Sequence, residues 1–89
     1  MKSHITAGFR LCFGRLPEHV KSTARKNYRI WKGEPTHPSL AFKKVGHTTD
    51  SYAVRIGIGW RALGVKKDNV MIWFWIGSHA EYDNLIRNL

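Results

Sequence analysis

The chain has 89 residues, of which 43% are hydrophobic. This length and composition support one compact domain over residues 1–89 and exclude a disordered chain or a second domain. Fifteen Lys and Arg stand against six Asp and Glu, which gives a formal net charge of +9. So large an excess indicates an anionic partner, either a nucleic acid or an acidic protein, and less readily a lipid surface.

Cysteine content and hydropathy exclude further classes of protein. A lone cysteine, Cys12, excludes an internal disulfide and a cysteine-based zinc cluster, and no two of the five histidines are four residues apart. The most apolar stretch, residues 70–76, is far shorter than the roughly 20 residues of a membrane-spanning helix. No signal-peptide pattern opens the chain. We expect a cytoplasmic protein that uses no metal and no other cofactor.

Two helices are predicted in the first third of the chain. Apolar residues recur every three or four positions over residues 5–16, and Pro17 then breaks the pattern and is suited to open a second helix. That helix runs to Lys32, where Gly33 ends it. Because almost no loop separates the two helices, we expect them to pack as an antiparallel hairpin. The second helix carries a basic stripe, for which a solvated face is favoured over a phosphate track.

After Pro38 the apolar period changes from 3.6 to 2 residues, which is typical of strands. Four strands are expected, near residues 40–43, 52–56, 60–65 and 69–76. The segments between the last three have the composition of hairpin turns. The final strand is apolar on both faces, so it should be central in the sheet.

Ser78 and Glu81 have the spacing of a capping box and predict a last helix. Its inner stripe comprises Tyr82, Leu85, Ile86 and Leu89. The predicted fold class is therefore α+β: an N-terminal antiparallel helix hairpin packed on a mainly antiparallel four-stranded sheet, with a C-terminal helix. A short extra strand before Ile5 is left open.

One face of this sheet gathers residues suited to cleaving RNA. Arg55 alternates away from the helix-facing side of its strand, and Arg61 opens the next strand after a short turn, so the two guanidinium groups should lie close together. His79 begins the last helix, where the positive end of the helix dipole disfavours an imidazolium. A neutral imidazole can accept the proton of a ribose 2′-hydroxyl while arginines stabilise the charge at phosphorus.

We therefore predict a catalytic set of Arg55, Arg61, His79 and Tyr82. The residues predicted to bind RNA are Lys43, Lys44, His47, Arg25 and Arg29.

Structural roles remain open for the same residues. The two arginines can instead pair with Glu81, Asp83 or Asp50, and His79 can be satisfied by a nearby carbonyl. Tyr82 lies on the apolar stripe of its helix, which favours a core position. For the tryptophans at 73 and 75, packing is favoured over stacking on bases.

Several stretches resemble the RelE/ParE superfamily of bacterial toxins. They are Leu16-Pro17 with the basic helix that follows, and residues 37–45, 52–57, 60–64 and 73–83. The resemblance implies a small basic α+β toxin of a type II toxin–antitoxin module, neutralised by a co-encoded antitoxin protein. It also implies one of two activities, because RelE-like members cut mRNA on the ribosome without a metal, whereas ParE-like members inhibit DNA gyrase.

The resemblance assigns roles to individual residues. Arg55 and Arg61 match basic positions on the family's second and third strands, and His79 matches a position that is Arg or His in nuclease members. The chain departs from the pattern at Ala53, where a basic residue is usual, and only Tyr82 lies near the usual C-terminal catalytic tyrosine. We expect a ribosome-dependent mRNA endoribonuclease with an antitoxin partner. A gyrase inhibitor and a degenerate antitoxin-binding module are the alternatives.

Overall fold

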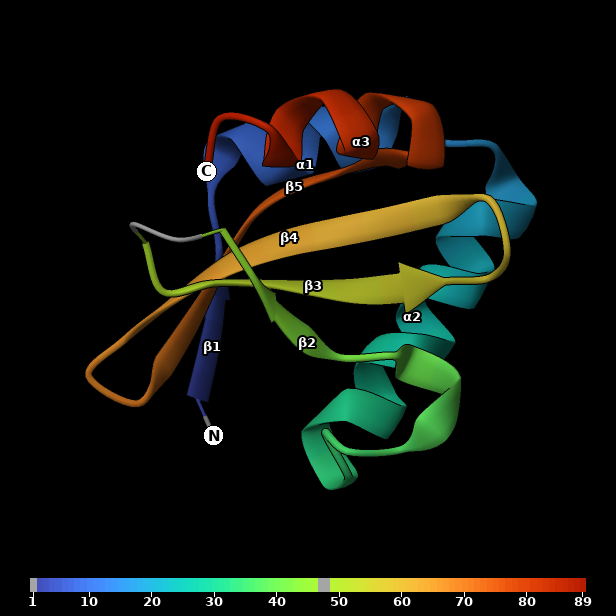
Figure 1. Cartoon of the computed structure of the whole chain (residues 1–89). Helices are drawn as coiled ribbons and strands as arrows, with labels where there is room; N and C mark the ends of the chain where they lie inside the picture. Colours follow the sequence, from blue (N-terminus) through green and yellow to red (C-terminus); the bar gives the residue numbers. More distant parts are fainter. Residues whose placement is uncertain (1, 47–48) are drawn as a thin grey trace.

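The computed structural model describes residues 2–46 and 49–89, which form a five-stranded sheet with helices on both faces (Figure 1). The sheet order is β1-β5-β4-β3-β2, and all neighbours are antiparallel except β1, which runs parallel to β5. In chain order the elements are β1 (Lys2–Ile5), α1 (Ala7–Gly14), α2 (Glu18–Gly33), the short helical turn η1 (Pro38–Leu40), β2 (Lys43–Val45), β3 (Ser51–Ile56), β4 (Trp60–Lys67), β5 (Val70–Ser78) and α3 (His79–Ile86).

The N-terminal strand changes the predicted architecture. The α+β class is confirmed, but the sheet is mixed and five-stranded rather than four-stranded and mainly antiparallel. Ile5 was predicted to belong to the first helix, yet it pairs with Trp73 as the last residue of β1. Thr6 then caps α1, its side-chain oxygen accepting a hydrogen bond from the backbone N–H of Phe9 at 3.0 Å. This cap separates strand from helix one residue after Ile5.

The predicted antiparallel helix hairpin differs in detail from the structure. The helix α1 packs on β5, whereas α2 packs on β3, so each helix buries its apolar stripe against the sheet rather than against the other helix. The guanidinium of Arg25 lies over the ring of Phe13, 5.2 Å from its centroid, and bridges the space between the helices. A short connection therefore did not produce a tightly packed helix pair.

Two smaller predictions also differ from the structure. Leu40 was predicted to open a strand, but it lies fully buried in η1. The strand in this region is β2, which begins only at Lys43. Ala41 follows η1 with φ of 45°, a left-handed conformation that turns the chain toward β2. Leu85, expected on the inner stripe of the last helix, is 38% exposed.

The core is divided by the sheet into two clusters. The larger one joins α1 and α2 to one face through residues such as Val20, Trp31 and Trp73, and the smaller one joins α3 to the other face around Leu63 and Tyr82. A bulge sits at the register shift beside Leu63 and Gly64, so that the tryptophans at 73 and 75 pack on opposite faces. Both therefore pack, as predicted. The strand β5 has partners on both sides, as its apolar faces predicted, although β4 is the middle strand.

Within residues 2–46 and 49–89, no helix combines the length and the apolar character needed to cross a membrane.

Candidate active-site cleft

A cleft of about 350 Å³ opens between β3, β4 and the start of α3. It lies on the sheet face opposite α1 and α2, and its lining includes Lys43, Arg55, Arg61, His79, Tyr82 and Asp83. All four residues of the predicted catalytic set thus line one cavity, together with one of the five residues predicted to bind RNA. Their catalytic role remains a prediction.

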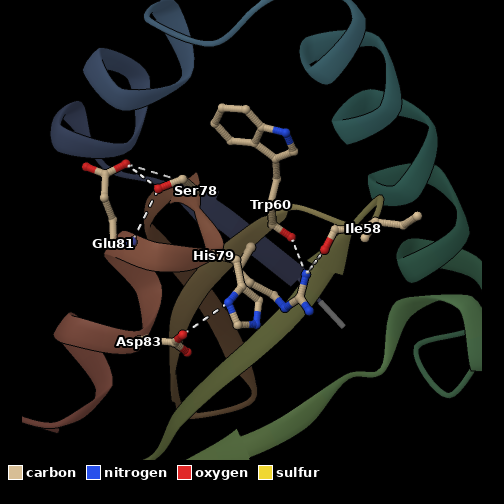
Figure 2. Close-up of polar contacts among 7 residues, drawn as sticks. Ile58, Trp60, Ser78, His79, Glu81 and Asp83 are labelled. Atoms are coloured by element: carbon tan, nitrogen blue, oxygen red, sulfur yellow. Dashed lines mark hydrogen bonds and ion pairs between the residues drawn. The ribbon is translucent and has the colours of Figure 1, made fainter.

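The two arginines are neighbours across the β3–β4 hairpin. Arg55 and Arg61 are direct partners in the register, so their side chains leave the sheet on the same face. The Nη1 atom of Arg61 donates to the carbonyl oxygens of Trp60 at 2.7 Å and Ile58 at 3.2 Å (Figure 2). The Nε atom of Arg55 donates to the carbonyl of Ser39 at 3.4 Å. Backbone carbonyls therefore hold both side chains without neutralising their charge.

The alternative that these arginines serve as structural ion pairs is not supported in the described residues. The three carboxylates considered for that role are engaged elsewhere: Glu81 with Ser78, Asp83 with His79, and Asp50 with Lys44 at 3.5 Å. Two guanidinium groups next to each other without a carboxylate between them produce a local positive potential that attracts anions.

The capping box fixes the position of His79. The Ser78 side chain accepts from the backbone N–H of Glu81 at 3.2 Å, and the Glu81 carboxylate accepts from the Ser78 backbone N–H at 3.3 Å (Figure 2). The backbone N–H of His79 donates to the carbonyl of Gly59 at 2.8 Å, which ties the start of α3 to the β3–β4 turn. The ring Nδ1 of His79 lies 3.1 Å from Asp83 Oδ2.

Tyr82 belongs to the core and to the cleft at once. It is only 5% exposed, it packs with Leu63, and its ring centroid lies 5.9 Å from that of His79. Burial raises the pKa of the Tyr82 phenol, an effect that the charge of Arg61 opposes and that of Asp83 reinforces. The phenol therefore keeps its proton at neutral pH and can donate it.

The other residues predicted to bind RNA are distributed differently. Lys43 lines the cleft, whereas Lys44 alternates to the opposite face of β2 and pairs with Asp50. Arg25 and Arg29 are on α2, across the sheet from the cleft. His47 lies outside the described residues.

Sequence reasoning missed two contributors to the cleft. Asp83 was weighed only as a partner of the arginines, although its position four residues after His79 on a predicted helix was a usable signal. The Ser39 carbonyl, which holds Arg55, belongs to η1, a helical turn that the sequence analysis did not predict.

A second and larger cavity, of about 590 Å³, lies on the other face of the sheet between β1, α1 and α2. We call it the helix groove. Apolar side chains including Phe9, Trp31 and Trp73 line it, together with Arg10, Arg25 and Arg29. Within residues 2–46 and 49–89, no cluster of three or more His, Cys, Asp or Glu side chains is arranged to hold a metal ion.

Several solved structures share this fold. A chain of the RelB–RelE antitoxin–toxin complex of Methanococcus jannaschii matches with a TM-score of 0.73 and 12% identity, covering 91% of this chain and 95% of that one. The Escherichia coli DinJ–YafQ toxin–antitoxin complex gives 0.73 and 8% identity over 90% and 93%. The archaeal RelE–RelB complex of Pyrococcus horikoshii gives 0.66 and 20% over 86% and 92%. No curated protein sequence matches significantly.

The ParE-like toxin domain family matches residues 18–84, from the first residue of α2 to the last turn of α3. This match includes β3, β4 and every residue that lines the cleft except Ile86. The chain therefore belongs to the ParE-like toxin domain family, within the RelE/ParE superfamily of toxins.

Proposed function

We propose that this toxin is an endoribonuclease that cuts mRNA during translation, using the cleft between β3, β4 and α3. The observation that carries the proposal is that two unneutralised arginines, a histidine and a proton-bearing tyrosine line one open cavity. This combination supplies the charges and proton-transfer groups needed to cleave a phosphodiester next to a ribose 2′-hydroxyl.

The proposed reaction is an internal transesterification. His79 accepts the proton of the 2′-hydroxyl as its oxygen attacks phosphorus, and the bond from phosphorus to the 5′-oxygen breaks. Arg55 and Arg61 stabilise the extra negative charge on the phosphorane, and Tyr82 donates its proton to the departing 5′-oxygen. The products are a 2′,3′-cyclic phosphate and a 5′-hydroxyl, and no step of this scheme requires a metal ion.

The test is to incubate the purified toxin with a defined mRNA, with and without translating ribosomes, and to map and chemically identify the new ends. We expect cleavage within codons in the presence of ribosomes, and a loss of at least about 100-fold in rate for His79→Ala and Arg61→Ala, the scale of a general acid–base or charge-stabilising group. Cleavage at the wild-type rate by both variants would refute the proposal.

Inhibition of DNA gyrase is the second candidate, and the match to the ParE-like family favours it. It requires a basic docking surface but no proton transfer in the cleft. The same protein samples should then produce stalled gyrase–DNA complexes and leave the mRNA intact, and His79→Ala should inhibit gyrase as well as the wild type does.

We also propose an antitoxin partner, as in the toxin–antitoxin complexes that share this fold. The net charge of +9 and the helix groove, with an apolar lining and three arginines, suit an acidic, amphipathic segment that folds as it binds. We expect this segment of the antitoxin to place apolar side chains in the helix groove and carboxylates against Arg10, Arg25 and Arg29.

A further inference from the structure

His79 makes a side-chain contact that the proposed reaction does not by itself require. Its Nδ1 atom lies 3.1 Å from Oδ2 of Asp83, one helical turn further along α3 (Figure 2). A carboxylate oxygen carries only lone pairs, so at this distance it repels an unprotonated Nδ1, and in the neutral ring the contact favours the proton on Nδ1. The other nitrogen, Nε2, then carries the lone pair and is directed away from Asp83.

Asp83 is available for this role because the other charged side chains near it have different hydrogen-bond partners. Glu81 closes the capping box with Ser78, while Arg55 and Arg61 are held by backbone carbonyls. The His79 and Asp83 side chains are 46% and 50% exposed, so the pair lies at the mouth of the cleft and not beneath the surface. Substrate can therefore reach the ring without breaking the pair.

We infer that Asp83 is a positioning residue, which holds the His79 ring in the tautomer that offers Nε2 as the proton acceptor in the cleft. This inference rests on the proposed endoribonuclease function for its consequence in catalysis, but the pairing itself can be tested without any activity. An ordinary surface pair on a helix contributes to stability without fixing how the ring works. If Asp83 positions the ring, by contrast, its loss also changes which ring nitrogen of His79 carries the proton, and it lowers the turnover rate.

The first measurement is a long-range proton–nitrogen NMR spectrum of the His79 ring in the full chain, at a pH where the ring is neutral. We expect the Nδ1–H tautomer in the wild type and a shift toward Nε2–H in Asp83→Ala. Asp83→Glu, whose carboxylate still reaches one helical turn, should restore Nδ1–H. Asp68→Asn is the matched control, because it removes one negative charge in the β4–β5 turn, at the far end of β4 from Arg61, and asparagine tolerates the φ of 51° found there.

The second measurement is RNA cleavage by the same variants. Asp83→Ala should lower kcat about tenfold or more with KM nearly unchanged, since positioning contributes part of the benefit of a general base. It should cause no further loss when added to His79→Ala. Thermal melting identifies any variant that fails to fold. If Asp83→Ala does not fold, the tautomer and the cleavage rate of Asp83→Glu test the positioning role instead.

The outcomes separate the two claims. An unchanged tautomer in Asp83→Ala, or a loss in kcat that multiplies with that of His79→Ala, overturns the positioning role while leaving the nuclease in place. If the wild type cleaves no RNA, the proposed function fails, and the NMR spectra alone decide whether Asp83 sets the tautomer.

Discussion

Tyr82 belongs to the core and also carries a role in the proposed reaction. Its ring is part of the smaller core cluster, which explains why sequence periodicity favoured a core position. The same ring lines the cleft beside His79, and burial raises the pKa of its hydroxyl. A buried phenol of this kind stays neutral at pH 7, so in its core position Tyr82 still carries the proton that the proposed reaction requires.

The raised pKa of Tyr82 makes stability depend on pH in one direction. The unfolded chain releases the phenol proton near pH 10, before the folded chain does, so the contribution to stability is complete below about pH 10 and is lost as pH rises through the folded pKa. Between pH 9 and 11, urea unfolding followed by tryptophan fluorescence should therefore show a smaller loss of stability in Tyr82→Phe than in the wild type. Parallel curves for the two proteins would contradict the shift.

The central residues of the cleft could be predicted from the sequence because signals close to them in the chain determine their positions. The short turn after β3 fixes the register that pairs Arg55 with Arg61, and the capping box fixes His79 at the first position of α3. The position of the Ser39 carbonyl could not be predicted in this way. It depends on how η1 packs against β3, a tertiary contact that local residues do not signal.

Secondary-structure elements were predictable where their signals are local. The fold class, the hairpins and the last helix follow from periodicity, turn residues and caps. The strand β1 has only four residues and is held by parallel pairing with β5, nearly 70 residues further along the chain, so local composition could not decide it. The helix hairpin differed in detail because the choice between packing on a helix and packing on the sheet is a tertiary one.

The start of α3 is the element on which the cleft depends most. Replacing Ser78 by Ala removes the side-chain acceptor for the Glu81 N–H and should cost about 1 kcal/mol of stability. It should also reduce RNA cleavage by more than this stability loss explains, because the first turn carries His79. Chemical denaturation and cleavage rates at a temperature where the variant is fully folded measure the two effects. Ser22→Ala, at an exposed position on α2, is the control.

At the scale of the whole molecule, the sheet separates two cavities of different character. The cleft on the α3 face has several charged groups and a volume near 350 Å³, whereas the helix groove on the other face is largely apolar and near 590 Å³. Of the residues that line the two, Val54 is shared, within the sheet that divides them. Because the cavities face opposite directions, a partner in the groove and a nucleotide in the cleft would contact different side chains.

This separation predicts that toxicity and neutralisation can be uncoupled by mutation. Reversing the charge of Arg25 and Arg29 to Glu should weaken binding of an acidic antitoxin by about tenfold or more, because like charges then meet across the interface. Growth arrest should persist, since neither side chain lines the cleft. The measurement is growth with and without the co-expressed antitoxin, together with the affinity of the antitoxin by calorimetry. Circular dichroism confirms folding, because Arg25 also covers Phe13.

The variant His79→Ala should behave in the opposite way: it should not arrest growth, yet it should bind the antitoxin as tightly as the wild type does. A charge-reversed toxin that the antitoxin still neutralises would place the partner outside the helix groove.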